Sequence, residues 1–227
     1  MREGPTLTSD NMKSPRAAAI AGIVFATLSL ISHLLIRNSI PPNPLGSASD
    51  FLNQLKTITF VLTVTPFAGI AFLWFIGVVR DRIGSLEDRF FATVFLGSGL
   101  LYIALLFSAA ALAGGLLRIL ASESETIVHS GAYAVSRATI YQLLNVYMIK
   151  MAAVFMISVS TIWMRTRIGP RALPFLGYAL ALVLLVGTFE WAPIVFPLWI
   201  YLISVSILIE KFRGQSHTQP HSVSAVP

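Results

Sequence analysis

Residues 91–117 read FATVFLGSGLLYIALLFSAAALAGGLL, a stretch without a single charged side chain. A helix needs about 20 predominantly apolar residues to cross the ~30 Å hydrocarbon core of a bilayer. The stretch is therefore long enough for one crossing. Five similar apolar runs flank it, at residues 17–36, 57–79, 139–164, 172–190 and 194–209. Together the runs predict an all-α integral membrane bundle of six transmembrane helices.

Lysine and arginine residues alternate in number between these runs. From the N-terminus, the segments outside the runs hold 3, 2, 3, 2, 3, 0 and 2 of them, so alternate segments total 11 against 4. Short cytoplasmic loops carry the excess of positive charge in membrane proteins. Both termini are therefore predicted to face the cytoplasm. The chain then divides into a cytoplasmic N-terminal segment (1–16), a transmembrane domain (17–209) and a disordered cytoplasmic tail (210–227).

The composition favours the same class of protein and excludes several others. Of 227 residues, 56% are hydrophobic and only 11% are charged, whereas a soluble domain carries about 25% charged residues. The net charge of +6 is explained by topology and by attraction to anionic lipid, since no dense basic cluster with interleaved aromatics suggests nucleic acid. The lipid bilayer is thus the expected partner. Without cysteine there are no disulfides or thiolate metal sites, and neither a metal nor a cofactor is expected.

Three ionisable residues lie inside the apolar runs, namely His33, Lys150 and Glu190. Counted from the nearest inner arginine at 1.5 Å per residue, they stand about 25, 22 and 28 Å into the membrane. This common level lies in roughly the outer quarter of the hydrocarbon core. Tyr147 falls on the same side of its helix as Lys150. The four residues form a candidate polar site near the outer face.

Two interpretations of this candidate site stay open. In the functional one, Lys150 pairs with Glu190 in a water-filled vestibule, because polar residues of membrane helices normally face the bundle interior. In the structural one, Lys150 extends its long stem toward the headgroups and Glu190 already lies among them. A Lys150–Glu190 pair that only fixes helix packing belongs to this second interpretation.

The run at 91–117 carries a stripe of small residues within a narrow arc of the predicted helix: Gly97, Ala104, Ser108, Ala111 and Gly115. Small residues let the backbones of membrane helices approach closely. The stripe therefore predicts helix packing, with this helix at the centre of the bundle.

Two stretches carry a resemblance to known proteins: Phe72-Leu-Trp-Phe-Ile-Gly-Val-Val-Arg-Asp-Arg-Ile-Gly84 and Glu87-Asp-Arg-Phe-Phe-Ala-Thr-Val-Phe-Leu-Gly-Ser-Gly99. They resemble uncharacterised bacterial multi-span membrane proteins. The resemblance implies a bacterial cytoplasmic membrane. It implies no activity, substrate or functional residue.

No catalytic motif stands out in the sequence. There is no Gly-x-Ser-x-Gly elbow, no phosphate-binding glycine-rich loop and no His-Glu-x-x-His, so a non-enzymatic role is expected. The first hypothesis is transport or sensing of a small solute or ion through the polar site. The alternative is an accessory or assembly subunit, bound to a membrane protein partner or to a second copy through the inner loop 80–90 or the small-residue stripe.

Overall fold

The computed structural model of the chain describes residues 15–39, 55–83, 89–122, 131–166 and 172–216, and all of these except 187–191 are helical. The predicted all-α fold is therefore confirmed for the described part of the chain. The first three long helices are α1 (Pro15–Ser39), α3 (Leu55–Ile83) and α4 (Arg89–Ser122). Most of the predicted N-terminal segment and disordered tail, and the centre of the inner loop 80–90, lie outside the described residues.

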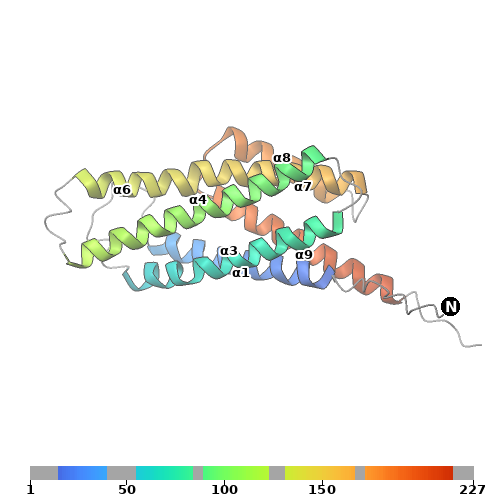
Figure 1. Ribbon diagram of the computed structural model, residues 1–227, viewed down its shortest axis with the longest axis horizontal. Coiled ribbons are helices and arrows are strands. Elements are labelled where there is room, and N and C mark those ends of the chain that lie inside the picture. Colours follow the sequence, from blue (N-terminus) through green and yellow to red (C-terminus); the bar gives the residue numbers. More distant parts are fainter. Residues whose placement is uncertain (1–14, 40–54, 84–88, 123–130, 167–171, 217–227) are drawn as a thin grey trace, which may run out of the picture.

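The next helical rod combines α6 (Gly131–Gln142), the π-helix η1 (Leu143–Tyr147) and α7 (Met148–Thr166) without a break. It runs along the whole bundle in yellow in Figure 1. The rod begins roughly two turns before the apolar run at residue 139, because residues 131–138 continue the helix. The chain then forms α8 (Ala172–Val186) and α9 (Ala192–Ser216).

Five stretches are long and apolar enough to cross a membrane: Ala17–Ile36, Leu55–Arg80, Phe90–Ala121, Gly131–Arg165 and Ala192–Ile209. The predicted run at 172–190 differs, since α8 ends at Val186 after 15 residues. At 1.5 Å per residue it rises about 22 Å, which is less than the ~30 Å hydrocarbon core. The helices are those of a multi-pass membrane protein, with five helices long and apolar enough to cross and one short apolar helix in the described part of the chain.

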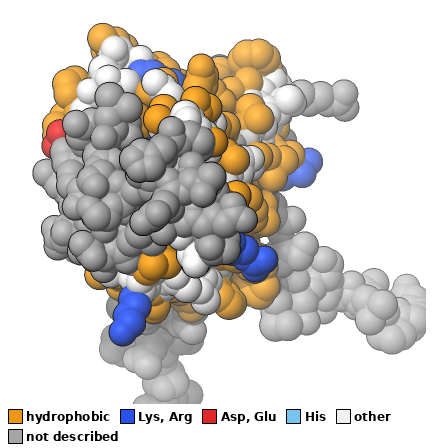
Figure 2. Space-filling model, turned by 90° about the vertical axis from the view of Figure 1, so that its left-hand side faces the viewer, with side chains coloured by type: hydrophobic (Ala, Val, Ile, Leu, Met, Phe, Trp, Pro, Cys, Tyr) orange, Lys and Arg blue, Asp and Glu red, His pale blue; other side chains and the backbone are white. Residues whose placement is uncertain are grey.

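The long helices form a ring. α1 packs along α3 and α9, and α4 packs along α3 and α7, while α8 lies against α7 (Figure 1). Large side chains fill the interior of the ring in the half predicted to face the cytoplasm. The largest fully buried ones include Phe25, Phe72, Phe155, Phe196 and Trp199. Hydrophobic side chains also cover much of the flanks in the end-on view of Figure 2. An apolar exterior around a packed interior is what contact with lipid tails requires.

The small-residue stripe of α4 faces away from the bundle. Ala104, Ser108, Ala111 and Gly115 are exposed, and a Cβ added to Gly97 or Gly115 would meet nothing within 4 Å. The predicted packing of this stripe at the bundle centre is therefore wrong. The ring leaves a wide centre that needs large side chains, so α4 turns Phe95, Tyr102, Ile103, Leu116 and Leu117 inward.

Close approach between helices occurs instead at Gly22 of α1. A Cβ there would collide with Ser204 Oγ and lie 2.8 Å from Phe75 Cδ2, whereas Gly97 has open space around it. We expect Gly22→Ala to lower the free energy of unfolding by about 1–3 kcal/mol, because overpacking forces neighbouring groups to move. The matched control, Gly97→Ala, should be neutral or stabilising by up to ~1 kcal/mol through helix propensity. Unfolding titrations in mixed micelles compare the two, and equal stabilities would contradict the α1 packing.

Candidate ligand-binding pocket

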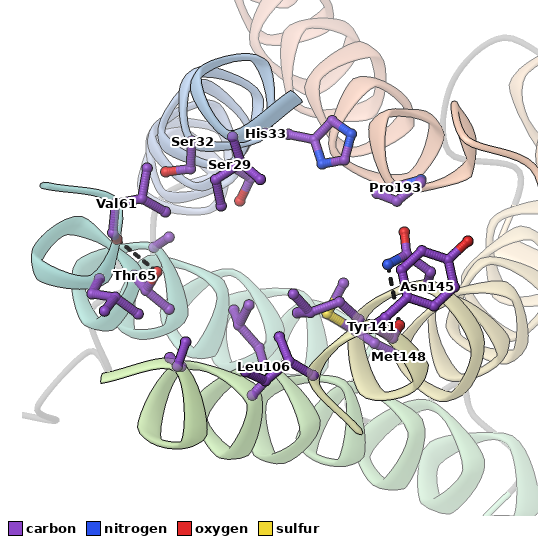
Figure 3. A pocket seen from close by; sticks show the side chains of 18 of the residues that line it. Ser29, Ser32, His33, Val61, Thr65, Leu106, Tyr141, Asn145, Met148 and Pro193 are labelled. Carbon is purple, nitrogen blue, oxygen red and sulfur yellow. Dashed lines mark hydrogen bonds between the residues drawn. The ribbon is translucent and has the colours of Figure 1, made fainter. Parts of the chain in front are cut away.

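A pocket of about 500 Å³ lies in the centre of the ring, in the half where α1 and α4 end and α3, α6 and α9 begin. Its walls come from α1, α3, α4, the α6–η1–α7 rod and the start of α9. In Figure 3, Ser29 and His33 of α1 face Leu106 of α4 and Met148 of α7 across the open space. The charge pattern predicts this half to be the outer one. The pocket therefore lies at the level of the candidate polar site, although most of its residues are different.

An aromatic cluster borders the pocket at Tyr102. The name covers one buried ring from each of five helices, Phe25 of α1, Phe72 of α3, Tyr102 of α4, Phe155 of α7 and Phe196 of α9, and Phe75 and Phe95 continue the ring contacts on α3 and α4. The ring centroid of Phe72 lies 4.6 Å from Phe25, 5.3 Å from Tyr102, 5.2 Å from Phe155 and 5.5 Å from Phe196. Tyr102 belongs both to this cluster and to the pocket wall. Along α1, α3 and α7, the residues of the aromatic cluster lie farther than the pocket residues toward the half of the bundle predicted to face the cytoplasm.

The pocket wall is mostly apolar, with a few polar groups. Tyr102 is only 4% exposed, and its hydroxyl has no hydrogen bond within the described residues. Asn145 Nδ2 donates to the carbonyl oxygen of Tyr141 at 3.1 Å, which leaves its side-chain oxygen as an acceptor (Figure 3). The Thr65 hydroxyl already donates to the Val61 carbonyl oxygen at 2.8 Å. The Tyr102 hydroxyl and the Asn145 side-chain oxygen are therefore available to a ligand, as is the Ser32 hydroxyl, which is buried in the wall and has no hydrogen-bond partner in the described part of the chain.

One cation, one anion and one histidine also line the pocket. Arg137 of α6 is 7% exposed, and its Nη1 donates to the Tyr133 hydroxyl at 3.2 Å. Glu190 is exposed and lies in the turn between α8 and α9, and His33 of α1 is half-buried. Arg137 and Glu190 carry opposite formal charges, which cancel.

Three helices around the pocket depart from regular α-helical hydrogen bonding. Pro66 in α3 and Pro197 in α9 have no N–H, so the carbonyls of Leu62 and Pro193 lose their usual donor. Leu62 and Pro193 both line the pocket, as do two residues of the π-helix η1. Irregular backbone at membrane depth is tolerated where protein or a water-filled cavity borders it, and short π-helical turns are frequent at functional sites. This part of the bundle therefore has the backbone features of a binding site.

The structure brings together only two of the four residues of the predicted polar site. His33 and Glu190 both line the pocket. Tyr147 is 59% exposed and Lys150 lies outside the pocket wall. The predicted contact between Lys150 and Glu190 is not made, because the Lys150 ammonium contacts the backbone at the end of α8 instead. A functional role for any of these four residues stays a prediction.

Lys150 caps the C-terminus of α8. Its Nζ donates to the carbonyl oxygens of Leu184 at 2.9 Å, Leu185 at 2.7 Å and Gly187 at 3.1 Å. An ammonium group has three N–H donors, so all three are used. The last carbonyls of a helix lack intrahelical partners, and hydrocarbon offers no water to replace them. A positive charge also suits the negative end of the helix dipole. Lys150 therefore allows α8 to end short of a full crossing.

Sequence reasoning missed Tyr102, Arg137 and Asn145. Arg137 lies between the apolar runs at 91–117 and 139–164, and therefore outside the predicted crossings. The uninterrupted helical stretch without glycine or proline from residue 132 to 166 is the signal that could have placed it on the fourth long helix. Tyr102 and Asn145 lie inside apolar runs, and nothing in the sequence separates them from ordinary core or surface residues.

These features define a multi-pass helical membrane protein with an internal pocket. Comparison of the chain with models of protein families, with curated proteins and with solved structures finds no match. The resemblance of residues 72–99 to bacterial membrane proteins therefore stays a prediction. The function has to be argued from the pocket itself.

Proposed function

We propose that this protein binds a small molecule in the central pocket and transports it or senses it, without catalysing a reaction. The supporting observation is a cavity of about 500 Å³ walled by the long helices and bordered by the aromatic cluster at Tyr102. In the proposed orientation, both termini lie in the cytoplasm of a bacterial cell and the pocket faces outward. Transport then requires the aromatic cluster to part, whereas sensing requires only that the ligand favour one arrangement of the helices.

The pocket suits a molecule better than a bare ion. Small-molecule sites typically occupy about 300–1,000 Å³ and combine apolar walls with a few placed polar groups. This pocket has both features. Among the described residues, no group of three His, Asp or Glu side chains could hold a metal ion.

Filling the pocket from one wall tests this proposal. Ala113 of α4 lines the pocket, whereas Ala179 of α8 is exposed and lies outside it. We expect compounds from a diverse small-molecule panel to raise the Tm of the wild-type chain and of Ala179→Phe, but not of Ala113→Phe. A ligand at roughly 100 times its Kd stabilises a protein by about 2.7 kcal/mol, which is readily seen in a melting curve. Equal Tm shifts in all three proteins, or no Tm shift in any of them, would contradict binding in the pocket.

A second candidate function is that of an accessory subunit in a membrane complex. The exposure of Ala104, Ser108, Ala111 and Gly115 on one face of α4 favours it, because small residues permit close contact with a helix of another chain. We expect a partner or a second copy to co-purify in mild detergent, and Ser108→Trp to release it. Ligand binding in the pocket should survive that substitution, so the two functions can be separated.

A further inference from the structure

We infer that the pocket takes an uncharged, largely apolar molecule that carries a hydroxyl or carbonyl group and is held through the Tyr102 hydroxyl. This inference rests on the proposed function and names the ligand class of the same site. It draws on the charge balance of the pocket, on the placement of its polar groups and on the position of Tyr102.

The charge balance disfavours a charged ligand. Arg137 and Glu190 supply one charge of each sign, so neither an anion nor a cation meets a net opposite charge. Most remaining wall residues are apolar, among them Ile58, Leu62 and Leu106. Moving an ion from water against such walls costs far more than moving a hydroxyl or carbonyl group that finds a hydrogen bond. An uncharged ligand avoids this cost.

Tyr102 supplies that hydrogen bond at the deep end of the pocket. It carries the polar atom of the aromatic cluster, in which the other four members are phenylalanines. Its ring centroid lies 4.8 Å from that of Phe196 and 5.3 Å from that of Phe72, so the ring has little freedom to turn its hydroxyl elsewhere. A buried tyrosine hydroxyl usually finds a partner, and none is present among the described residues. A ligand oxygen at this position completes the pairing.

The test is a competition series with four ten-carbon compounds. Full-length protein in detergent is photolabelled with a ten-carbon alcohol that bears a diazirine, and labelled peptides are mapped. Decanol, decane, decanoate and decylammonium then compete at equal mole fraction in the micelles. We expect labels on the pocket walls and strongest competition by decanol. Tyr102→Phe should weaken competition by decanol by roughly threefold to tenfold, the range of one neutral hydrogen bond. It should leave competition by decane unchanged.

The matched control is Tyr201→Phe, which removes the same hydroxyl from an exposed tyrosine outside the pocket and should leave the whole series unchanged. Stronger competition by decanoate or decylammonium would overturn the ligand class while leaving a binding pocket in place. If Tyr102→Phe weakens competition by decane as much as competition by decanol, the ligand class is also overturned while the pocket stays in place. Labels that no competitor displaces would overturn the pocket itself, and with it the proposed function.

Discussion

Lys150→Met is expected to lower the free energy of unfolding by about 3 kcal/mol. The substitution removes the donor to three carbonyl oxygens at the end of α8, and a buried acceptor left without a partner costs about 1–3 kcal/mol. Methionine keeps an unbranched side chain of similar length, so the change isolates the ammonium group. Unfolding titrations in mixed micelles measure the loss. Hydrogen exchange should rise in residues 183–192, where the released end of the helix frays.

The control for this substitution is Lys56→Met, at an exposed lysine near the start of α3. Surface changes of this kind usually stay within about 0.5 kcal/mol. The comparison also separates the two interpretations of Lys150 left open by the sequence. If Lys150→Met abolishes ligand binding while the stability and the exchange of residues 183–192 stay as in the wild type, then Lys150 acts in binding and its capping role is minor.

The helices could be predicted because hydropathy and length alone determine them. Each apolar run became a helix over most of its length, and His33 and Glu190, which the constant rise per residue predicts at a similar level, both line the pocket. The contact of Lys150 could not be predicted in the same way. It depends on α8 ending at Val186, whereas the predicted run continues through Gly187 and Thr188 to residue 190. A helix end is decided by the carbonyls that find a partner, and that partner lies on another helix.

The direction in which α4 faces could not be predicted either. In a soluble protein, the polar face of a helix marks the outside, but lipid and protein interior are equally apolar. Small residues suit close packing wherever another helix is present, inside the chain or in a second one. The stripe from Gly97 to Gly115 therefore carried no information on which neighbour it meets. Burial of Tyr102 on the opposite face becomes visible only once the ring of helices is assembled.

Phe72→Ala is expected to have the other large effect, a loss of about 3–5 kcal/mol in the free energy of unfolding, as for large aromatic residues removed from a core. Phe72 is fully buried and its ring contacts four others from α1, α4, α7 and α9. Its removal takes one ring contact from each of the four. The resulting space adjoins the pocket at Tyr102, so the pocket should extend toward the half of the bundle predicted to face the cytoplasm.

Phe67→Ala is the matched control, because Phe67 lies on the same helix and is 62% exposed. It should change stability by no more than about 0.5 kcal/mol. The milder Phe72→Leu keeps the fold measurable if Phe72→Ala does not express, and it should move photolabels from the alcohol probe deeper along α3 and α7. Equal stability of Phe72→Ala and Phe67→Ala would show that the aromatic cluster does not hold the bundle together. Unchanged labels in a destabilised Phe72→Leu would show that it supports the helices without closing the pocket.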